Sequence, residues 1–180
     1  MKRRLVWLVG HLGAVFYNYF VTWLPSHTIR QLVLRAWGAK IGKDSAIFRG
    51  STVLGIEGIR IGEATTIGFR CLLDARGGLT IGDNVVIASD VQFIAGRHLP
   101  NSDDFRHELA PTVVEDFAWI ASRSTVLEGL TIGRGAVVGA CSLVRKSIEP
   151  MEIVAGIPAK HVAVRTSALK YRPMYKPMLF

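Results

Sequence analysis

The sequence predicts an all-β fold, a triangular solenoid of short parallel strands, preceded by an apolar α-helical segment. Two observations predict the solenoid: an apolar residue recurs at every sixth position, and a small side chain usually follows it four residues later. A third observation, the uncharged stretch LVWLVGHLGAVFYNYFVTWL at residues 5–24, predicts the helical segment. With 180 residues, of which 49% are hydrophobic, the chain is long enough for one domain with its own core.

The apolar stretch at residues 5–24 is as long as one bilayer crossing. Basic residues lie on both sides of it, so a simple span would place one basic cluster outside, against the positive-inside rule. A hinge at Pro25 lets both clusters face an anionic membrane surface instead. We therefore expect residues 1–38 to associate with the membrane. Packing on the protein's own core or on a neighbouring subunit is the alternative.

A second helix is expected directly after the hinge. Ser26 is a typical N-cap residue, and Gly38 can end the helix. Helical spacing places five apolar residues on one face, with Arg30 and Gln31 elsewhere. The five are Ile29, Leu32, Val33, Ala36 and Trp37.

The net charge of +8 is concentrated at the two ends of the chain. Residues 1–43 hold seven Lys and Arg and no acidic residue, and residues 161–180 add four basic residues and no acidic one. A nucleic-acid-binding protein would carry basic and aromatic residues together on a folded face, so we expect no nucleic-acid partner. Cys71 and Cys141 lack metal-ligand or disulfide spacing, which predicts free thiols in a reducing compartment.

The six-residue period begins near residue 39. The apolar positions are Ile41, Ile47, Val53, Ile61, Ile67, Leu73, Ile81, Ile87, Phe93, Val114, Ile120, Val126, Ile132, Val138 and Val144. The small residues that follow are Ser45, Ser51, Thr65, Cys71, Ala118, Ser124, Ala136 and Ser142. Helices do not repeat at six, whereas three hexapeptides with inward large and small side chains close one triangular coil, stacked at about 4.8 Å on the next.

One long insertion interrupts the repeat. The step from Phe93 to Val114 is too long for two adjacent hexapeptides, so residues 95–112 are expected to leave the solenoid at a corner. Insertions of this kind are surface loops, where functional residues concentrate. This one contains His98, in the stretch IAGRHLPN.

The repeat resembles the hexapeptide-repeat acyltransferases, most closely the galactoside, maltose and colanic-acid-type exopolysaccharide O-acetyltransferases. The residues that carry the resemblance are TIGDNVVIASDVQFIAGRH, AWIASRSTVLEGLTIGRGAVVGACSLVRKSI and IVAGIPAK, in the family's order. The resemblance covers about residues 39–164 and implies a left-handed parallel β-helix. Residues 165–180 then form a basic C-terminal tail that caps the solenoid, clamps a neighbour or touches the membrane.

The resemblance implies that His98 is the general base, which takes the acceptor's hydroxyl proton as the oxygen attacks acetyl-CoA. Imidazole suits this role because it exchanges protons near neutral pH. His107, in the same insertion, is the rival base. Asp74 could orient His98, bind acceptor hydroxyls or shape a corner turn, and Asp103, with Asp104, could bind the acceptor.

The same resemblance places the acetyl-CoA site on the later coils. Trp119 is expected to point outward beside the reacting groups and the CoA arm, and the backbone N–H near Ser122 would stabilise the oxyanion. Ala140 would let the CoA arm run against the backbone. Three cations are candidates for the CoA phosphates: Arg145, Lys146 and Lys160. No metal is expected.

The sequence therefore predicts an acetyl-CoA-dependent sugar O-acetyltransferase. The resemblance implies a homotrimer with active sites between subunits, and the basic, apolar N-terminus places it at the cytoplasmic face of the inner membrane, near a saccharide acceptor. N-acetylation of an amino sugar and a non-catalytic scaffold are the alternatives. A zinc lyase needs three histidines from neighbouring coils, and the coils offer only His98 and His107.

Overall fold

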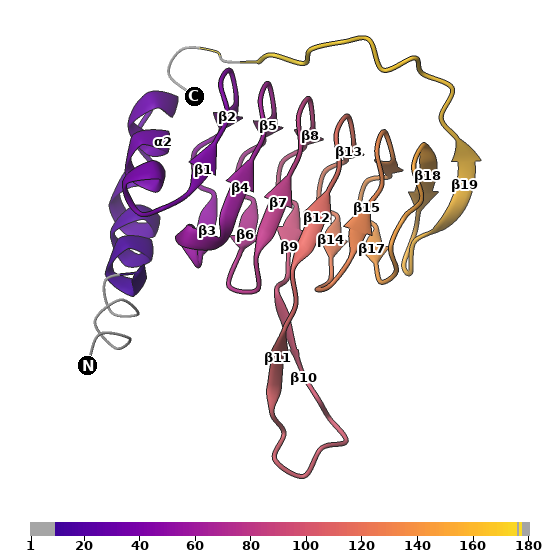
Figure 1. The fold of residues 1–180 in the computed structure, drawn as a ribbon, viewed down its shortest axis with the longest axis horizontal. Helices are drawn as coiled ribbons and strands as arrows, with labels where there is room; N and C mark the ends of the chain where they lie inside the picture. Colours follow the sequence, from indigo (N-terminus) through magenta and orange to yellow (C-terminus); the bar gives the residue numbers. More distant parts are fainter. Residues whose placement is uncertain (1–9, 176, 178–180) are drawn as a thin grey trace.

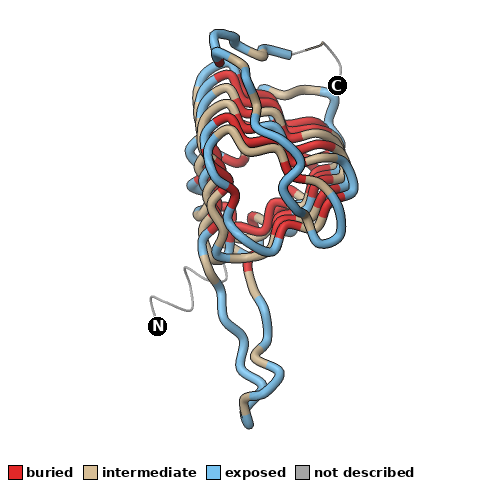
Figure 2. Tube along the Cα trace, turned by 90° about the vertical axis from the view of Figure 1, so that its right-hand side faces the viewer, coloured by how far each residue is buried: buried red, intermediate tan, exposed pale blue. Residues whose placement is uncertain are grey.

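A computed structural model describes residues 10–175 and 177, which form a parallel β-solenoid with helices at one end and a long arm at its side (Figure 1). The strands stack into three sheets, named here walls A, B and C in the order in which each coil visits them. Viewed along the solenoid axis, buried residues line the inside of the coils (Figure 2). The predicted solenoid fold is confirmed.

The strands are short, and each one pairs with its equivalent in the next coil. Wall A contains β1 (Lys40–Ile41), β4 (Ile59–Ile61), β7 (Leu79–Ile81), β12 (Thr112–Val114) and β15 (Thr131–Ile132). Wall B contains β2 (Ala46–Ile47), β5 (Thr66–Ile67), β8 (Val86–Ile87), β13 (Trp119–Ile120), β16 (Val137–Val138), β18 (Glu152–Ala155) and the antiparallel β19 (Lys160–Val164). Wall C contains β3 (Thr52–Leu54), β6 (Leu72–Asp74), β9 (Gln92–Phe93), β14 (Thr125–Val126) and β17 (Leu143–Val144). A 3₁₀ turn, η2 (Ile56–Gly58), joins the first two coils.

The six-residue period marks the core. Of the predicted inward apolar positions, all are buried except Ile41, which is partly buried and packs against the others. The small residues that follow them are buried as well, and their hydroxyls bond the next coil: Ser45 Oγ donates to Gly62 O (2.6 Å) and Thr65 Oγ1 to Gly82 O (2.7 Å). Buried hydroxyls are tolerated there because the turn carbonyls of the neighbouring coil accept hydrogen bonds from them.

The corners use left-handed backbone conformations at a fixed place in each coil. At the corner between walls A and B, Ala64 (φ 50°), Asn84 (φ 56°) and Phe117 (φ 61°) occupy equivalent positions in successive coils. The N–H of each donates to the preceding coil, for example Ala64 N to Lys43 O at 2.9 Å. Stacked turns of this kind keep the register between coils, because each turn is hydrogen-bonded to the one before it.

Two helices cover the first coil. Residues 10–16 are helical and continue into a π-helical turn, η1 (Tyr17–Val21), and α2 (His27–Ala36) follows. Ser26 is the N-cap of α2, as predicted, since its Oγ accepts a hydrogen bond from Ile29 N. No helix among residues 10–175 is long and apolar enough to cross a membrane.

The packing face of α2 differs from the predicted apolar face. Ile29 and Leu32 of that face are exposed, whereas Arg30, Gln31 and Leu34 are buried against the solenoid. The reason is the open edge of the first coil, whose backbone carbonyls need hydrogen-bond donors. Arg30 Nη2 donates to Ile47 O (2.8 Å), and Gln31 Nε2 donates to Ser45 O (2.6 Å).

The insertion forms a two-stranded antiparallel arm, β10 (Gly96–His98) and β11 (His107–Leu109), which projects from the corner between walls C and A (Figure 1). The C-terminal tail leaves β19 and runs back along the solenoid towards the helical end (Figure 1). Arg165 and Arg172 attach it: Arg165 Nη1 donates to Phe117 O (3.0 Å), and Arg172 forms an ion pair with Asp44 (2.9 Å).

Candidate active site

His98 ends the outgoing strand of the arm, and a hydrogen bond and a ring contact hold its imidazole. Its Nδ1 lies 2.9 Å from Phe105 O, and its ring stacks on the Phe105 ring with centroids 4.5 Å apart and planes 8° apart. A carbonyl oxygen can only accept, so Nδ1 carries the proton and donates it. The lone pair is then on Nε2, which is the tautomer that a general base requires.

Phe105 adopts a left-handed backbone conformation. Its φ is +46°, in a region that bulky side chains usually avoid but that Phe117 also adopts at a solenoid corner. Asp104 holds this turn: its Oδ1 accepts hydrogen bonds from Ser102 Oγ (2.8 Å) and Arg106 N (3.2 Å), and the Ser102 bond lowers the pKa of the carboxyl below its usual value. The turn places the Phe105 carbonyl and ring against His98.

The other candidates on the arm are less constrained. His107 faces His98 across the hairpin with ring centroids 6.1 Å apart, and no hydrogen bond holds its ring within the described chain. Asp103 is exposed at the tip of the arm. The arm therefore brings His98 and His107 together and carries Asp103 at its tip, and only His98 of the two histidines has a ring hydrogen bond that fixes its tautomer.

Asp74 is buried at the root of the arm and does not bond His98. Its side chain is 4% exposed and forms an ion pair with Arg76 (2.7 Å), and its Oδ2 also accepts from Ala95 N (3.4 Å). Burial acts to raise the pKa of the Asp74 carboxyl, but the bonds from Arg76 and Ala95 outweigh it and lower the pKa. The carboxylate fixes where the arm leaves the solenoid, and Phe105 takes the orienting role considered for it.

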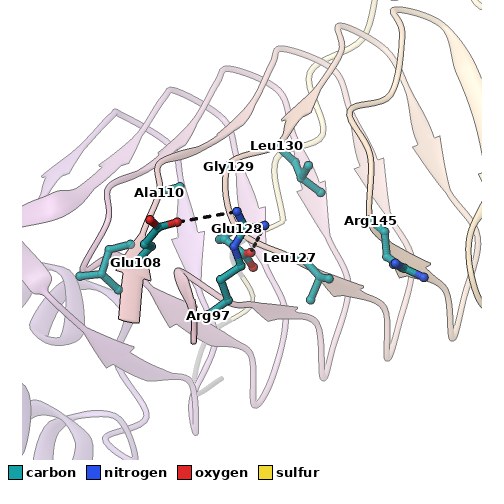
Figure 3. A pocket seen from close by; sticks show the side chains of 9 residues that line it. Arg97, Glu108, Ala110, Leu127, Glu128, Gly129, Leu130 and Arg145 are labelled. Carbon is teal, nitrogen blue, oxygen red and sulfur yellow. Dashed lines mark ion pairs between the residues drawn. The ribbon is translucent and has the colours of Figure 1, made fainter. Parts of the chain in front are cut away.

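A cavity of about 720 Å³ lies on the C-terminal side of the arm (Figure 3). Arg97 crosses it and forms ion pairs with Glu108 (3.7 Å) on the arm and Glu128 (3.5 Å) on the solenoid. Arg145 lines the same cavity from a later coil. Arg97 therefore connects the arm to the body, next in sequence to His98.

Trp119 lies on wall B, away from the arm of the same subunit. It pairs in register with Val86 and Val137, and its neighbour Ile120 is fully buried, so the indole points outward and is 46% exposed. The exposed indole is available to a ligand or to another subunit. Because the arm leaves between walls C and A, one subunit alone does not bring Trp119 to His98.

Ser122 and Ala140 share the corner between walls B and C, on adjacent coils. Cys141 N donates to Ser122 O at 2.9 Å, which connects the two turns. Within the described chain, no backbone acceptor takes the N–H of Ser122 or of Ala140. Two amide donors at a surface corner are available to an acyl oxygen or to an amide chain laid against the backbone.

The three cations predicted for the CoA phosphates share one cavity. Arg145, Lys146 and Lys160 line a space of about 400 Å³ together with His161, near the C-terminal coils. These side chains suit a polyanionic ligand. Among the described residues, no group of three or more His, Cys, Asp or Glu is placed to hold a metal ion.

No protein-family model matches the sequence. WcaF of Escherichia coli K12, named as a colanic acid biosynthesis acetyltransferase, is 33% identical to the chain over 139 residues, 76% of each protein. A hexapeptide-repeat acetyltransferase from Vibrio cholerae, solved with acetyl-CoA, superposes with a TM-score of 0.81 at 24% identity, covering 92% of this chain and 90% of its own. The chain belongs to the hexapeptide-repeat acetyltransferase family.

Two further solved structures resemble the chain. A galactoside acetyltransferase solved with coenzyme A has a TM-score of 0.77 and 26% identity, covering 87% of this chain and 79% of its own. AntD from Bacillus cereus, an N-acyltransferase, has a TM-score of 0.65 at 20% identity over 72% of this chain and 74% of its own, a likeness of fold alone. The predicted family is confirmed.

Sequence reasoning missed three residues of this acetyltransferase site: Phe105, Arg97 and Glu128. Pairing 96–98 with 107–109 across the turn LPNSDD would have placed Phe105 near His98, but no hexapeptide register extends into the insertion. The Arg97–Glu128 ion pair joins the arm to a coil that comes later in sequence, so no local pattern signals it.

Proposed function

We propose that this acetyltransferase moves an acetyl group from acetyl-CoA to a hydroxyl group of a sugar in envelope or exopolysaccharide assembly. The Vibrio cholerae and galactoside structures contain acetyl-CoA and coenzyme A, and WcaF is named for colanic acid biosynthesis. The observation that carries the chemistry is the hydrogen bond from His98 Nδ1 to Phe105 O, since it leaves Nε2 able to accept a proton.

The transfer is direct and uses the residues in named roles. His98 Nε2 takes the acceptor's hydroxyl proton as the oxygen bonds to the thioester carbon, and the Ser122 N–H stabilises the oxyanion that forms. The carbon–sulfur bond then breaks, and the imidazolium returns its proton to the departing CoA sulfur. The acceptor gains the acetyl group, CoA leaves as the thiol, and His98 is neutral again.

The cations Arg145, Lys146 and Lys160 would hold the phosphates of the acyl donor, and Ala140 would let its amide chain lie close to the backbone. Trp119 would pack beside the acyl group and the acceptor. Asp103, at the tip of the arm, would bind acceptor hydroxyls, whereas Asp74 would act through the root of the arm.

We further propose that the enzyme is a homotrimer whose sites form between subunits. The separation of His98 on the arm from Trp119 on wall B supports this arrangement, since a neighbouring copy can bring the second residue to the first. The basic and apolar N-terminus supports a place at the cytoplasmic face of the inner membrane, where acetyl-CoA and lipid-linked saccharides meet.

CoA release with a panel of free and lipid-linked sugars tests the proposal. The wild type should turn over with at least one acceptor, and His98→Ala should lower kcat by about 10²–10⁴-fold, the usual contribution of general-base assistance. His107→Ala is the matched control and should retain most of the activity. Turnover that persists unchanged in His98→Ala would exclude His98 as the base.

N-acetylation of an amino sugar is the second candidate, favoured by the fold likeness to AntD. The product decides between them, because an acetyl ester is cleaved by mild base and an amide is not. A base-stable acetylated product would replace the O-acetyl assignment with the N-acetyl one. A scaffold without catalytic activity would give no His98-dependent CoA release with any acceptor.

A further inference from the structure

The helices over the first coil present their large apolar side chains to solvent. We name this surface the end face. Its residues are Leu12, Phe16, Tyr19, Phe20, Trp23, Ile29 and Leu32. Tyr19, Phe20 and Leu32 are 73%, 66% and 64% exposed. Aromatic and aliphatic side chains gathered at one end of a molecule mark an interaction surface.

This exposure follows from the inward use of polar side chains. Asn18 both donates to Val53 O and accepts from Val53 N (2.9 Å each), and Thr22 Oγ1 donates to Ser51 O (2.7 Å). With Arg30 and Gln31, these side chains satisfy the open edge of the first coil. A helix that turns its polar face to the protein must turn its apolar face outward.

The segment that carries the end face is basic in sequence. Residues 1–43, which include every residue of that face, contain seven Lys and Arg and no Asp or Glu. The acidic residues Asp44 and Glu57 of the first coil lie beside the helices but are not part of this segment. Apolar side chains on a basic segment match a phospholipid surface with anionic headgroups, whose interior takes the apolar groups and whose phosphates attract the cations.

The C-terminal tail reaches the same end of the molecule (Figure 1). Thr66 Oγ1 donates to Pro173 O (3.3 Å), and the Tyr175 ring lies 5.6 Å from that of Phe48. Phe48 in turn contacts the His27 ring of α2 (5.2 Å). The described tail therefore brings two exposed apolar side chains, Met174 and Tyr175, to the helical end of the molecule.

We propose that the end face binds the surface of an anionic phospholipid bilayer. The apolar side chains enter the headgroup boundary, and the basic residues contact lipid phosphates. This inference deepens the proposed membrane location by assigning it a surface and a lipid chemistry, and it does not depend on which group is acetylated.

Flotation of the full-length protein with vesicles tests the inference. The wild type should float with phosphatidylglycerol-containing vesicles and much less with phosphatidylcholine vesicles. The variant Tyr19→Gln/Phe20→Gln/Trp23→Gln/Leu32→Gln should lose about tenfold or more of the vesicle-bound fraction, since binding scales with buried apolar area. Val162→Gln/Val164→Gln, equally exposed on β19 at the opposite end, is the matched control and should float like the wild type.

Wild type that stays unbound with anionic vesicles, or an end-face variant that floats unchanged, would overturn the inference. A change in oligomeric mass on end-face substitution would overturn it too, because the surface would then be a subunit contact.

CoA release with a free sugar separates this inference from the proposed function. The end-face variant should retain wild-type turnover of a soluble acceptor, because its substituted side chains are exposed and lie far from the arm along the chain. Vesicle binding by a chain without activity would leave the bilayer surface standing and remove the acetyltransfer. Activity without vesicle binding would leave the acetyltransfer standing and remove the bilayer surface.

Discussion

Phe105 is the residue whose role the structure defines most closely, since its carbonyl sets the His98 tautomer and its ring supports the imidazole. Phe105→Gly keeps the left-handed turn but removes the ring. A stacked ring pair contributes about 0.5–1.5 kcal/mol, so kcat should fall about two- to tenfold. Steady-state kinetics should show this fall with the KM for acetyl-CoA unchanged, because Phe105 is distant in sequence from the donor's cations.

Phe105→Tyr is the conservative control and should keep both the stacking and the activity. A general loss of folding would instead lower the melting temperature and affect both variants' donor KM. If Phe105→Gly turned over like the wild type with an unchanged pH–rate profile, the Phe105 ring would not position His98.

At the residue scale, the sequence predicts the inward positions that follow the six-residue period and few other residues. The inward positions follow from six-residue spacing, and His98 follows from a resemblance that ends at that residue. Phe105 could not be predicted in the same way, because nothing local indicates that an aromatic residue adopts φ +46°. Asp74 pairs with the nearby Arg76, but its bond from Ala95 N at the root of the arm depends on an approach that only the folded chain shows.

At the element scale, the helices act as a polar cover for the first coil, and Arg30 is the centre of that cover. It is fully buried, and its guanidinium donates to Ile47 O and Leu24 O. Arg30→Met leaves these carbonyls without their donor, and each buried unsatisfied group costs about 1–3 kcal/mol. We expect the free energy of unfolding to fall by about 2–4 kcal/mol.

Urea denaturation at fixed protein concentration measures the effect. Arg35→Met is the matched control. Arg35, on the same helix, also donates to a first-coil carbonyl, Ile41 O (3.0 Å), but this bond is exposed and water can replace it, so its removal should change stability by less than about 1 kcal/mol. Equal stability of the two variants would show that the buried carbonyls of the first coil do not depend on Arg30 for a donor.

Whether an element can be predicted depends on how close in sequence the residues that determine it lie. The coils could be predicted because each one repeats the same six-residue pattern of apolar residues. The N-cap of α2 could be predicted because the Ser26 side chain bonds a backbone N–H within one helical turn. The orientation of α2 could not be predicted. Helical periodicity shows which residues form an apolar stripe, but it does not show that the carbonyls of a strand distant in sequence need hydrogen-bond donors. The need of the first coil's carbonyls for hydrogen-bond donors outweighed the apolar pattern of the helix.

At the scale of the whole molecule, the solenoid separates the groups that the chemistry needs. His98 is on the arm between walls C and A, and Trp119 is on wall B. The geometry of a closed cyclic oligomer, in which one surface meets a different surface of the next copy, reunites them. In the proposed mechanism, catalysis therefore requires the trimer.

Mixed trimers test this requirement. His98→Ala and Trp119→Ala chains are each expected to be poorly active alone. Unfolded together in equal amounts and refolded, they form trimers in which a site between subunits receives His98 from one chain and Trp119 from the next. A given subunit supplies an intact His98 with a probability of one half, and its neighbour supplies an intact Trp119 with the same probability. About one quarter of the sites are therefore intact, and about one quarter of wild-type CoA release returns.

Sites contained within one subunit give the opposite result. Every chain in the mixture lacks either His98 or Trp119, so mixing would restore nothing. Light scattering should show trimers of equal mass in all samples, which ensures that a missing recovery reflects the position of the site and not a failure to assemble. Recovery near one quarter therefore follows only if the arm of one subunit works against wall B of its neighbour.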